Sequence, residues 1–136
     1  MTNVQMNGVL LSNIGVTLLS GAYGELLTPA PLKDYIENDD PTKDGVQIDT
    51  LVTPKQKSRD LTLRFLIQGN SVAQFAERYS AFVNMLYGGE VELFVPDIGM
   101  YFHLLYTSVT KYGNYRLNAC EVAVKFREPD PTNRGA

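Results

Sequence analysis

The chain has 136 residues, 44% of them hydrophobic and 20% charged, and its formal net charge at pH 7 is -3. A chain of this length buries roughly two thirds of its unfolded surface on folding, which predicts a single domain over residues 1–136 with its own core. The acidic balance without a basic stripe argues against specific nucleic-acid binding, and no apolar run approaches the roughly 18 residues that span a membrane.

The N-terminal region predicts short strands and no leader. Its first 15 residues lack the basic stretch of a signal peptide, so we expect synthesis in the cytoplasm. The apolar runs Val9–Leu11 and Val16–Leu19 are separated by polar residues and Gly15, which indicates two brief strands or one kinked strand.

The segment at about residues 21–45 has a different composition. It contains three prolines and a cluster of acidic and amide residues. Each proline removes a backbone donor, so no long central strand can run through the segment. Leu32–Asn38 is compatible with one or two helical turns, and the rest predicts a flexible loop or arm.

A loop of this length in a compact domain is usually functional or flexible. It is either a flexible surface loop or an arm that becomes ordered against a partner subunit, with Leu32, Tyr35 and Ile36 as apolar anchors. A metal site is a third alternative, although the acidic residues lack the spacing of a calcium-binding loop. These acidic residues are Asp34, Glu37, Asp39, Asp40 and Asp44.

Two strands are predicted between this segment and the helix. Val46–Val52 alternates like a half-buried strand, and the basic residues Lys55, Lys57 and Arg59 then indicate a solvated turn. Arg59–Gln68 is the clearest strand, because alternate residues are apolar and face one way. These apolar residues are Leu61, Leu63, Phe65 and Ile67.

Ser71–Gly89 predicts one long helix, at about residues 71–87. Its apolar residues recur at spacings of three and four and form one stripe. The stripe consists of Val72, Phe75, Ala76, Tyr79, Phe82, Val83 and Leu86. We expect Ser71 to cap the first turn, Gln74 to complete a capping box, and Gly88 to end the helix in the left-handed conformation.

The pattern returns to strands after the helix. Glu90–Val95 and Met100–Thr110 predict a hairpin, Lys111–Tyr115 a second turn, and Arg116–Phe126 the last strand. The tail at about residues 128–136 is expected to be loose. This order of elements predicts a mainly β (α+β) domain, an antiparallel β sandwich or split barrel with one packed α-helix.

No motif predicts catalysis or a cofactor. His103 is the single histidine and has no triad partner nearby in sequence, and the single cysteine, Cys120, is expected to be a buried structural thiol. Glu90 and Glu92 share one strand face, but no second feature marks them as a catalytic pair. We therefore predict no catalytic, cofactor-binding or metal-binding residues.

Tyrosine is concentrated in the second half of the chain. There are eight tyrosines, and aromatic side chains with a polar tip are favoured at interfaces, although ordinary sheet packing also uses them. The strand from Met100 is apolar or aromatic on both faces, which favours contact with another chain. Tyr101, His103 and Tyr106 therefore join the arm residues as candidate interface residues.

Four successive segments carry a resemblance to a known family. RDLTLRFLIQG, FAERYSAFVNMLYGG, EVELFVP and MYFHLLYTSV cover about Arg59 to Val109, and this pattern resembles the N-terminal domain of phage distal tail proteins and related tail-tube and baseplate components. The resemblance implies a virion structural protein of a phage or prophage tail. It also implies assembly with other copies into a ring, commonly a hexamer, and contact with other tail proteins.

In that family comparison, residues 28–45 correspond to the arm by which neighbours hold one another. The chain ends without the second domain of a full distal tail protein, so the resemblance implies a structural adaptor, with a tail-tube, terminator or connector subunit implied nearly as well.

Two other classes of function stay open. A small ligand- or carbohydrate-binding β module would use exposed tyrosines as stacking platforms and would be favoured by a concave aromatic cleft. An enzyme would have to use His103, and His103→Ala would then abolish its activity while leaving the fold intact.

Overall fold

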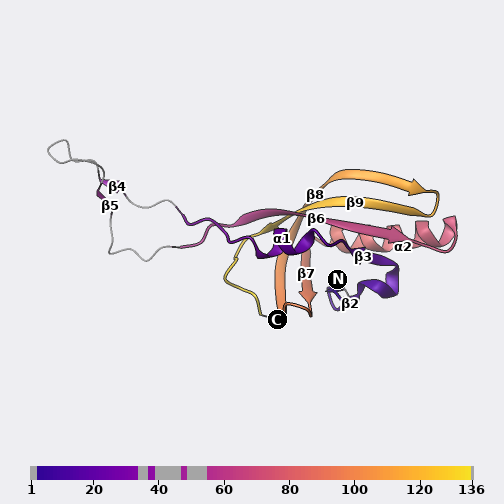
Figure 1. The fold of residues 1–136 in the computed structure, drawn as a ribbon, viewed down its shortest axis with the longest axis horizontal. Helices are drawn as coiled ribbons and strands as arrows, with labels where there is room; N and C mark the ends of the chain where they lie inside the picture. Colours follow the sequence, from indigo (N-terminus) through magenta and orange to yellow (C-terminus); the bar gives the residue numbers. More distant parts are fainter. Residues whose placement is uncertain (1–2, 34–36, 39–46, 49–54, 136) are drawn as a thin grey trace.

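The computed structural model describes residues 3–33, 37–38, 47–48 and 55–135. Within them, seven antiparallel strands form one curled sheet in the order β2-β1-β7-β8-β9-β6-β3, and the helix α2 packs against it (Figure 1). The expected mainly β class with one packed helix is confirmed. The sheet is a single layer, open at its β2 and β3 edges like a split barrel.

The elements follow one another in a simple order along the chain. The strands are β1 (Gln5–Met6), β2 (Val9–Leu10), β3 (Val16–Leu18), β4 (Glu37–Asn38), β5 (Gln47–Ile48), β6 (Arg59–Gln68), β7 (Glu90–Val95), β8 (Met100–Arg116) and β9 (Ala119–Glu128). The helices are the 3-10 helix η1 (Leu11–Ile14), α1 (Ala22–Leu27) and α2 (Val72–Tyr87).

The centre of the sheet is the pairing of β6 with β9. These two strands are in continuous register over their full length, from Arg59 opposite Glu128 to Gln68 opposite Ala119. The predicted alternation in β6 is confirmed, because every second residue from Arg59 is buried. The inward face of β9 carries Cys120, Val122, Val124 and Phe126, all buried as predicted.

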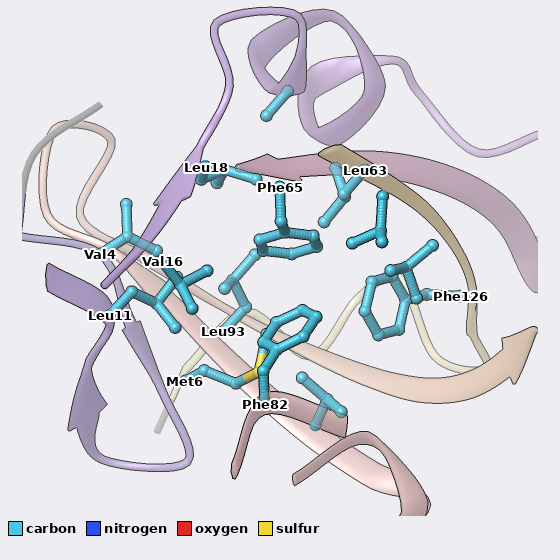
Figure 2. Packing of buried hydrophobic residues seen from close by; sticks show 14 of the residues in the cluster. Val4, Met6, Leu11, Val16, Leu18, Leu63, Phe65, Phe82, Leu93 and Phe126 are labelled. Carbon is cyan, nitrogen blue, oxygen red and sulfur yellow. The ribbon is translucent and has the colours of Figure 1, made fainter. Parts of the chain in front are cut away.

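The core lies between this sheet and α2. Phe82 of α2 contacts Phe65 of β6 with ring centroids 5.0 Å apart, and Phe126 of β9 meets the same ring at 6.4 Å (Figure 2). Met6 and Leu93 come from the paired strands β1 and β7 and pack into the same cluster. Core residues therefore come from both ends of the chain and from its middle.

The ends of α2 differ in detail from the prediction. Ser71 accepts the predicted capping hydrogen bond from the Gln74 N–H at 3.1 Å, but the Gln74 side chain accepts from Asn70 N–H, one residue before the expected donor. Gly88 is right-handed with φ -64°, and the left-handed residue is Gly89, with φ 88°. The expectation for Gly88 is wrong because the helix takes one more right-handed residue before it ends.

The predicted turn at Lys111–Tyr115 is wrong. The strand β8 runs through these residues to Arg116, and Leu117 and Asn118 connect it to β9. Three irregularities in the β8–β9 register absorb the extra residues, and Gly113 does not adopt a positive φ. A bulge uses the same residue types as a turn, which explains the error.

Two parts of the predicted arm are regular. The helix α1 occupies residues where a loop was expected, because Ala22 and Leu26, four residues apart, bury one face of a short helix. Further on, β4 pairs with β5 where helical turns were expected for residues up to Asn38, and this small ladder lies apart from the seven-stranded sheet (Figure 1). The predicted strand Val46–Val52 is confirmed at Gln47–Ile48; the rest of it lies outside the described residues.

Candidate functional site

Three of the candidate catalytic residues, Glu90, Glu92 and His103, line one surface hollow, whereas Cys120 is buried outside it. His103 Nε2 donates a hydrogen bond to the backbone carbonyl of Gly135, and its Nδ1 lies 3.9 Å from Oε2 of Glu92. Cys120 is fully buried, as expected of a structural thiol, and burial raises its pKa.

No metal site forms in the part of the chain that the structure describes, where no three His, Cys, Asp or Glu side chains are placed to share an ion. The acidic residues of the arm other than Glu37 lie outside that part, so the arm alternative stays open. None of the described helices is long and apolar enough to span a membrane.

The structure separates the predicted interface residues. Tyr101 and His103 alternate with the buried Phe102 and Leu104, whereas Tyr106 lies opposite Phe126 and packs against the core. Their side chains are also engaged within the chain. Tyr101 stacks on Phe94 with centroids 4.4 Å apart, and Tyr106 makes an edge contact with Tyr87 at 5.9 Å.

The predicted arm anchors are only partly described. Leu32 lies at the base of the arm with 42% of its surface exposed, and it forms an isolated bridge with Gln56. Tyr35 and Ile36 lie outside the described residues. Their role as anchors therefore stays a prediction.

A buried arginine at the foot of the arm is the feature that the sequence analysis missed. Arg59 was assigned to a solvated turn, yet only 8% of its surface is exposed. Its guanidinium donates to three backbone carbonyls at the end of α1, those of Glu25 (3.0 Å), Leu26 (2.8 Å) and Thr28. These are carbonyls that the helix itself leaves unpaired, and a cation is favourable at this end of a helix.

Arg59 also joins the end of α1 to the end of the central strand pair. Its Nε donates to Oε1 of Glu128 at 2.6 Å, and Glu128 is fully buried. Burying a charge is costly unless it is paired and hydrogen-bonded. Oε1 of Glu128 meets both conditions, whereas Oε2 is buried without a hydrogen bond. The chain leaves the body after Thr28 and returns at Arg59, and we call these two points the feet of the arm. The Arg59 side chain holds both of them in place.

The C-terminal tail, expected to be loose, lies against β8 and supplies the second partner of Glu128. Arg134 Nε is 3.0 Å from Glu128 Oε2, and Arg134 Nη2 donates to Oε1 at 3.0 Å. The guanidinium carbon lies 4.8 Å from the ring centroid of Phe102, and the Arg134 carbonyl accepts from Tyr101 N–H at 2.9 Å. The tail thus completes the charged cluster formed by Arg59, Glu128 and Arg134.

Beyond its feet, the arm begins as two antiparallel segments. The Lys57 N–H donates to the Pro31 carbonyl and the Lys33 N–H donates to the Lys55 carbonyl, both at 2.7 Å. Leu27, with 48% of its surface exposed, lies at the end of α1 next to this ladder, and Leu32 lies within it. The arm base therefore combines a backbone ladder with two exposed apolar side chains.

Several tyrosines in the described part of the chain pack on other aromatic rings. Tyr79 packs on Phe75 and meets Tyr112 edge-on with centroids 5.9 Å apart. Three surface hollows lined by described residues contain no tyrosine in their walls. Tyr87 and Tyr112 are exposed, with 71% and 49% of their surface accessible, but each meets another tyrosine edge-on and neither lines these hollows.

Comparison with known proteins gives a match at the level of fold. No family model matches the chain, and a search of curated proteins finds no significant match. Among solved structures, the chain is similar to the Dit protein of phage SPP1, described as a paradigm of the hub adsorption apparatus in phages that infect Gram-positive bacteria. The TM-score is 0.63 at 15% sequence identity.

The match covers 95% of this chain and 50% of the Dit chain, so the present sequence spans about half the length of that protein. At this identity the similarity shows a shared fold. The structural match extends beyond the four segments that carried the sequence resemblance, because those segments end at about Val109.

Proposed function

We propose that the chain is a structural subunit of a phage or prophage tail, in a distal tail, tail-tube or baseplate position, and that copies of it assemble into a ring, expected to be a hexamer. The observation that carries the proposal is the fold shared with the SPP1 Dit hub over nearly the whole chain. Its partners would be other copies of itself and other tail proteins, in the virion tail, after synthesis in the host cytoplasm.

The arm is the proposed link between neighbouring copies. A subunit that closes a ring needs two different surfaces, one meeting the other on the next copy. The arm leaves the body from an anchored base, because Arg59 fixes both of its feet. Leu27 and Leu32 are exposed at that base and would lose solvent contact against a neighbour.

This role requires no chemistry from the side chains. The buried cluster of Arg59, Glu128 and Arg134 connects structural elements. We propose that it sets the direction of the arm relative to the sheet. The protein would then act as an adaptor rather than as an enzyme.

The test is the solution mass of the full chain and of a variant lacking Pro29–Asp44, measured by light scattering over a concentration series. We expect a discrete oligomer near six subunits for the full chain and monomers for the deletion. If both chains form the same oligomer, the arm does not link neighbouring copies. A monomer at every concentration of the full chain would contradict ring formation.

A further inference from the structure

A polar hollow lies at the corner where β6 ends and β9 begins. Its volume is about 620 Å³, and its walls include Gly15, Asn70, Arg78, Arg116 and Asn118. Arg78 and Arg116 are the charged residues among the described residues that line it, and no carboxylate lines it. The hollow is therefore a cationic recess on a protein whose net charge is negative.

The walls of this hollow are held in place by hydrogen bonds. Arg78 Nη1 donates to the Gln68 carbonyl at 2.8 Å, which leaves most of the five guanidinium donors for other partners. Asn118 and Gly69 exchange two hydrogen bonds, of 2.6 and 3.0 Å, across the corner.

Gly15 gives Arg78 the space to lie there. A Cβ at this position would come within 2.5 Å of Arg78 Nη1 and of the Gln68 carbonyl oxygen, and Gly15 has φ +68°. The recess is thus a built feature of the fold, and Arg116 at its rim is exposed.

The opposite charge is concentrated in the arm. Residues 34–49 contain six carboxylates and a single lysine. Figure 1 shows the β4–β5 ladder of this segment at one end of the molecule, and the β8–β9 connection with the start of α2 at the other end. The β4–β5 ladder of one copy therefore lies far from the recess of the same copy.

We infer that the recess lined by Arg78 and Arg116 is the docking site for the acidic arm segment, residues 34–49, of a second copy of the chain. This inference rests on the proposed assembly and names the surface that receives the arm. Contact between two different ends of successive copies is heterologous, which is the geometry that a ring requires. Complementary charge also fixes the register of such a contact and excludes recess-to-recess pairing.

A charge swap on the full-length chain tests the inference. In the recess variant, Arg78→Glu and Arg116→Glu make the hollow acidic. In the arm variant, Asp39→Lys, Asp40→Lys and Asp44→Lys change the net charge of residues 34–49 from -5 to +1. We expect each variant alone to assemble about tenfold more weakly than the wild type or worse, because like charges now meet. An equimolar mixture should recover assembly, since each altered arm then meets an altered recess and each native arm a native recess.

Two controls make the swap specific. Lys111→Glu with Lys125→Glu changes the net charge as much as the recess variant does, but on β8 and β9 outside the hollow, and should leave assembly unchanged. Arg116→Glu alone alters an exposed side chain and should weaken assembly without changing the melting temperature. It keeps the test valid if Arg78→Glu disturbs folding.

The outcomes separate the two proposals. Normal assembly of the recess variant, or loss of assembly that the mixture does not restore, would overturn the docking site while leaving the ring intact as a proposal. A wild-type chain that stays monomeric at every concentration would overturn the ring and the docking site together.

Discussion

The body of the domain and the base of the arm meet at the first residue of β6 and are held by different forces. In the body, aromatic and aliphatic side chains such as Phe65 and Phe82 exclude water between the sheet and α2. At the arm base, Glu128 bridges two arginines, and one of these also binds the end of α1. Stability in the body is spread over many contacts, whereas the arm base depends on a few charged groups.

The largest expected effect comes from removing the shared carboxylate. Glu128→Ala leaves the buried Arg59 and the adjacent Arg134 without their counter-ion, and loss of one partner from a buried pair costs about 3–5 kcal/mol. The free energy of unfolding, from urea titration followed by circular dichroism, measures this cost. The double variant Arg59→Met/Glu128→Leu should be more stable than Glu128→Ala. A Glu128→Ala chain as stable as the wild type would show that the arm base does not depend on these charged groups.

A smaller effect is expected from the tail. Arg134→Ala removes one ion pair and the contact with the Phe102 ring but leaves Arg59 paired with Glu128, so we expect a loss of about 1–2 kcal/mol. Hydrogen exchange gives a local measurement, because Tyr101 N–H donates to the Arg134 carbonyl. Faster exchange at Tyr101 with unchanged exchange in β6 would match the account, whereas uniform acceleration would indicate a global loss of stability.

The cap of α2 tests the body of the domain alone. Ser71→Ala removes the acceptor of the Gln74 N–H bond and should cost about 1 kcal/mol. The midpoint of urea unfolding should fall while the oligomer mass at low denaturant stays that of the wild type. A change in assembly from this variant would show that the two regions are not independent.

The smallest expected effect on stability is at the arm base. Leu32→Ser changes an exposed side chain, so the free energy of unfolding should move by no more than about 0.5 kcal/mol. Assembly should nevertheless weaken, because the side chain would be buried against a neighbour. Val9→Ser, a similar change at the exposed edge strand β2, serves as the control and should leave both properties unchanged.

The sequence predicted the body far better than the arm base. The strand Arg59–Gln68 and the helix Val72–Tyr87 are visible because the hydrophobic pattern along the chain repeats the geometry of one buried face. The course of β8 was missed because its bulges resemble a turn locally, and only pairing with β9 settles the difference.

The charged cluster left a weaker signal. Arg59 lies on the same face of β6 as Leu61, and Glu128 lies on the same face of β9 as Phe126. Each charged residue therefore occupies an inward position. That pattern identifies buried charges, but the adjacent Lys55 and Lys57 made Arg59 look like part of an exposed patch. The pairing itself joins residues 69 positions apart, which no local pattern specifies.

The most direct test of the central claim, that an anchored arm links one copy to the next, is a cryo-electron microscopy reconstruction of the assembled protein. The account predicts a closed ring in which the arm of each copy crosses to its neighbour from a fixed base at Arg59. Rings in which every arm lies against its own sheet, or particles that are all monomers, would contradict it.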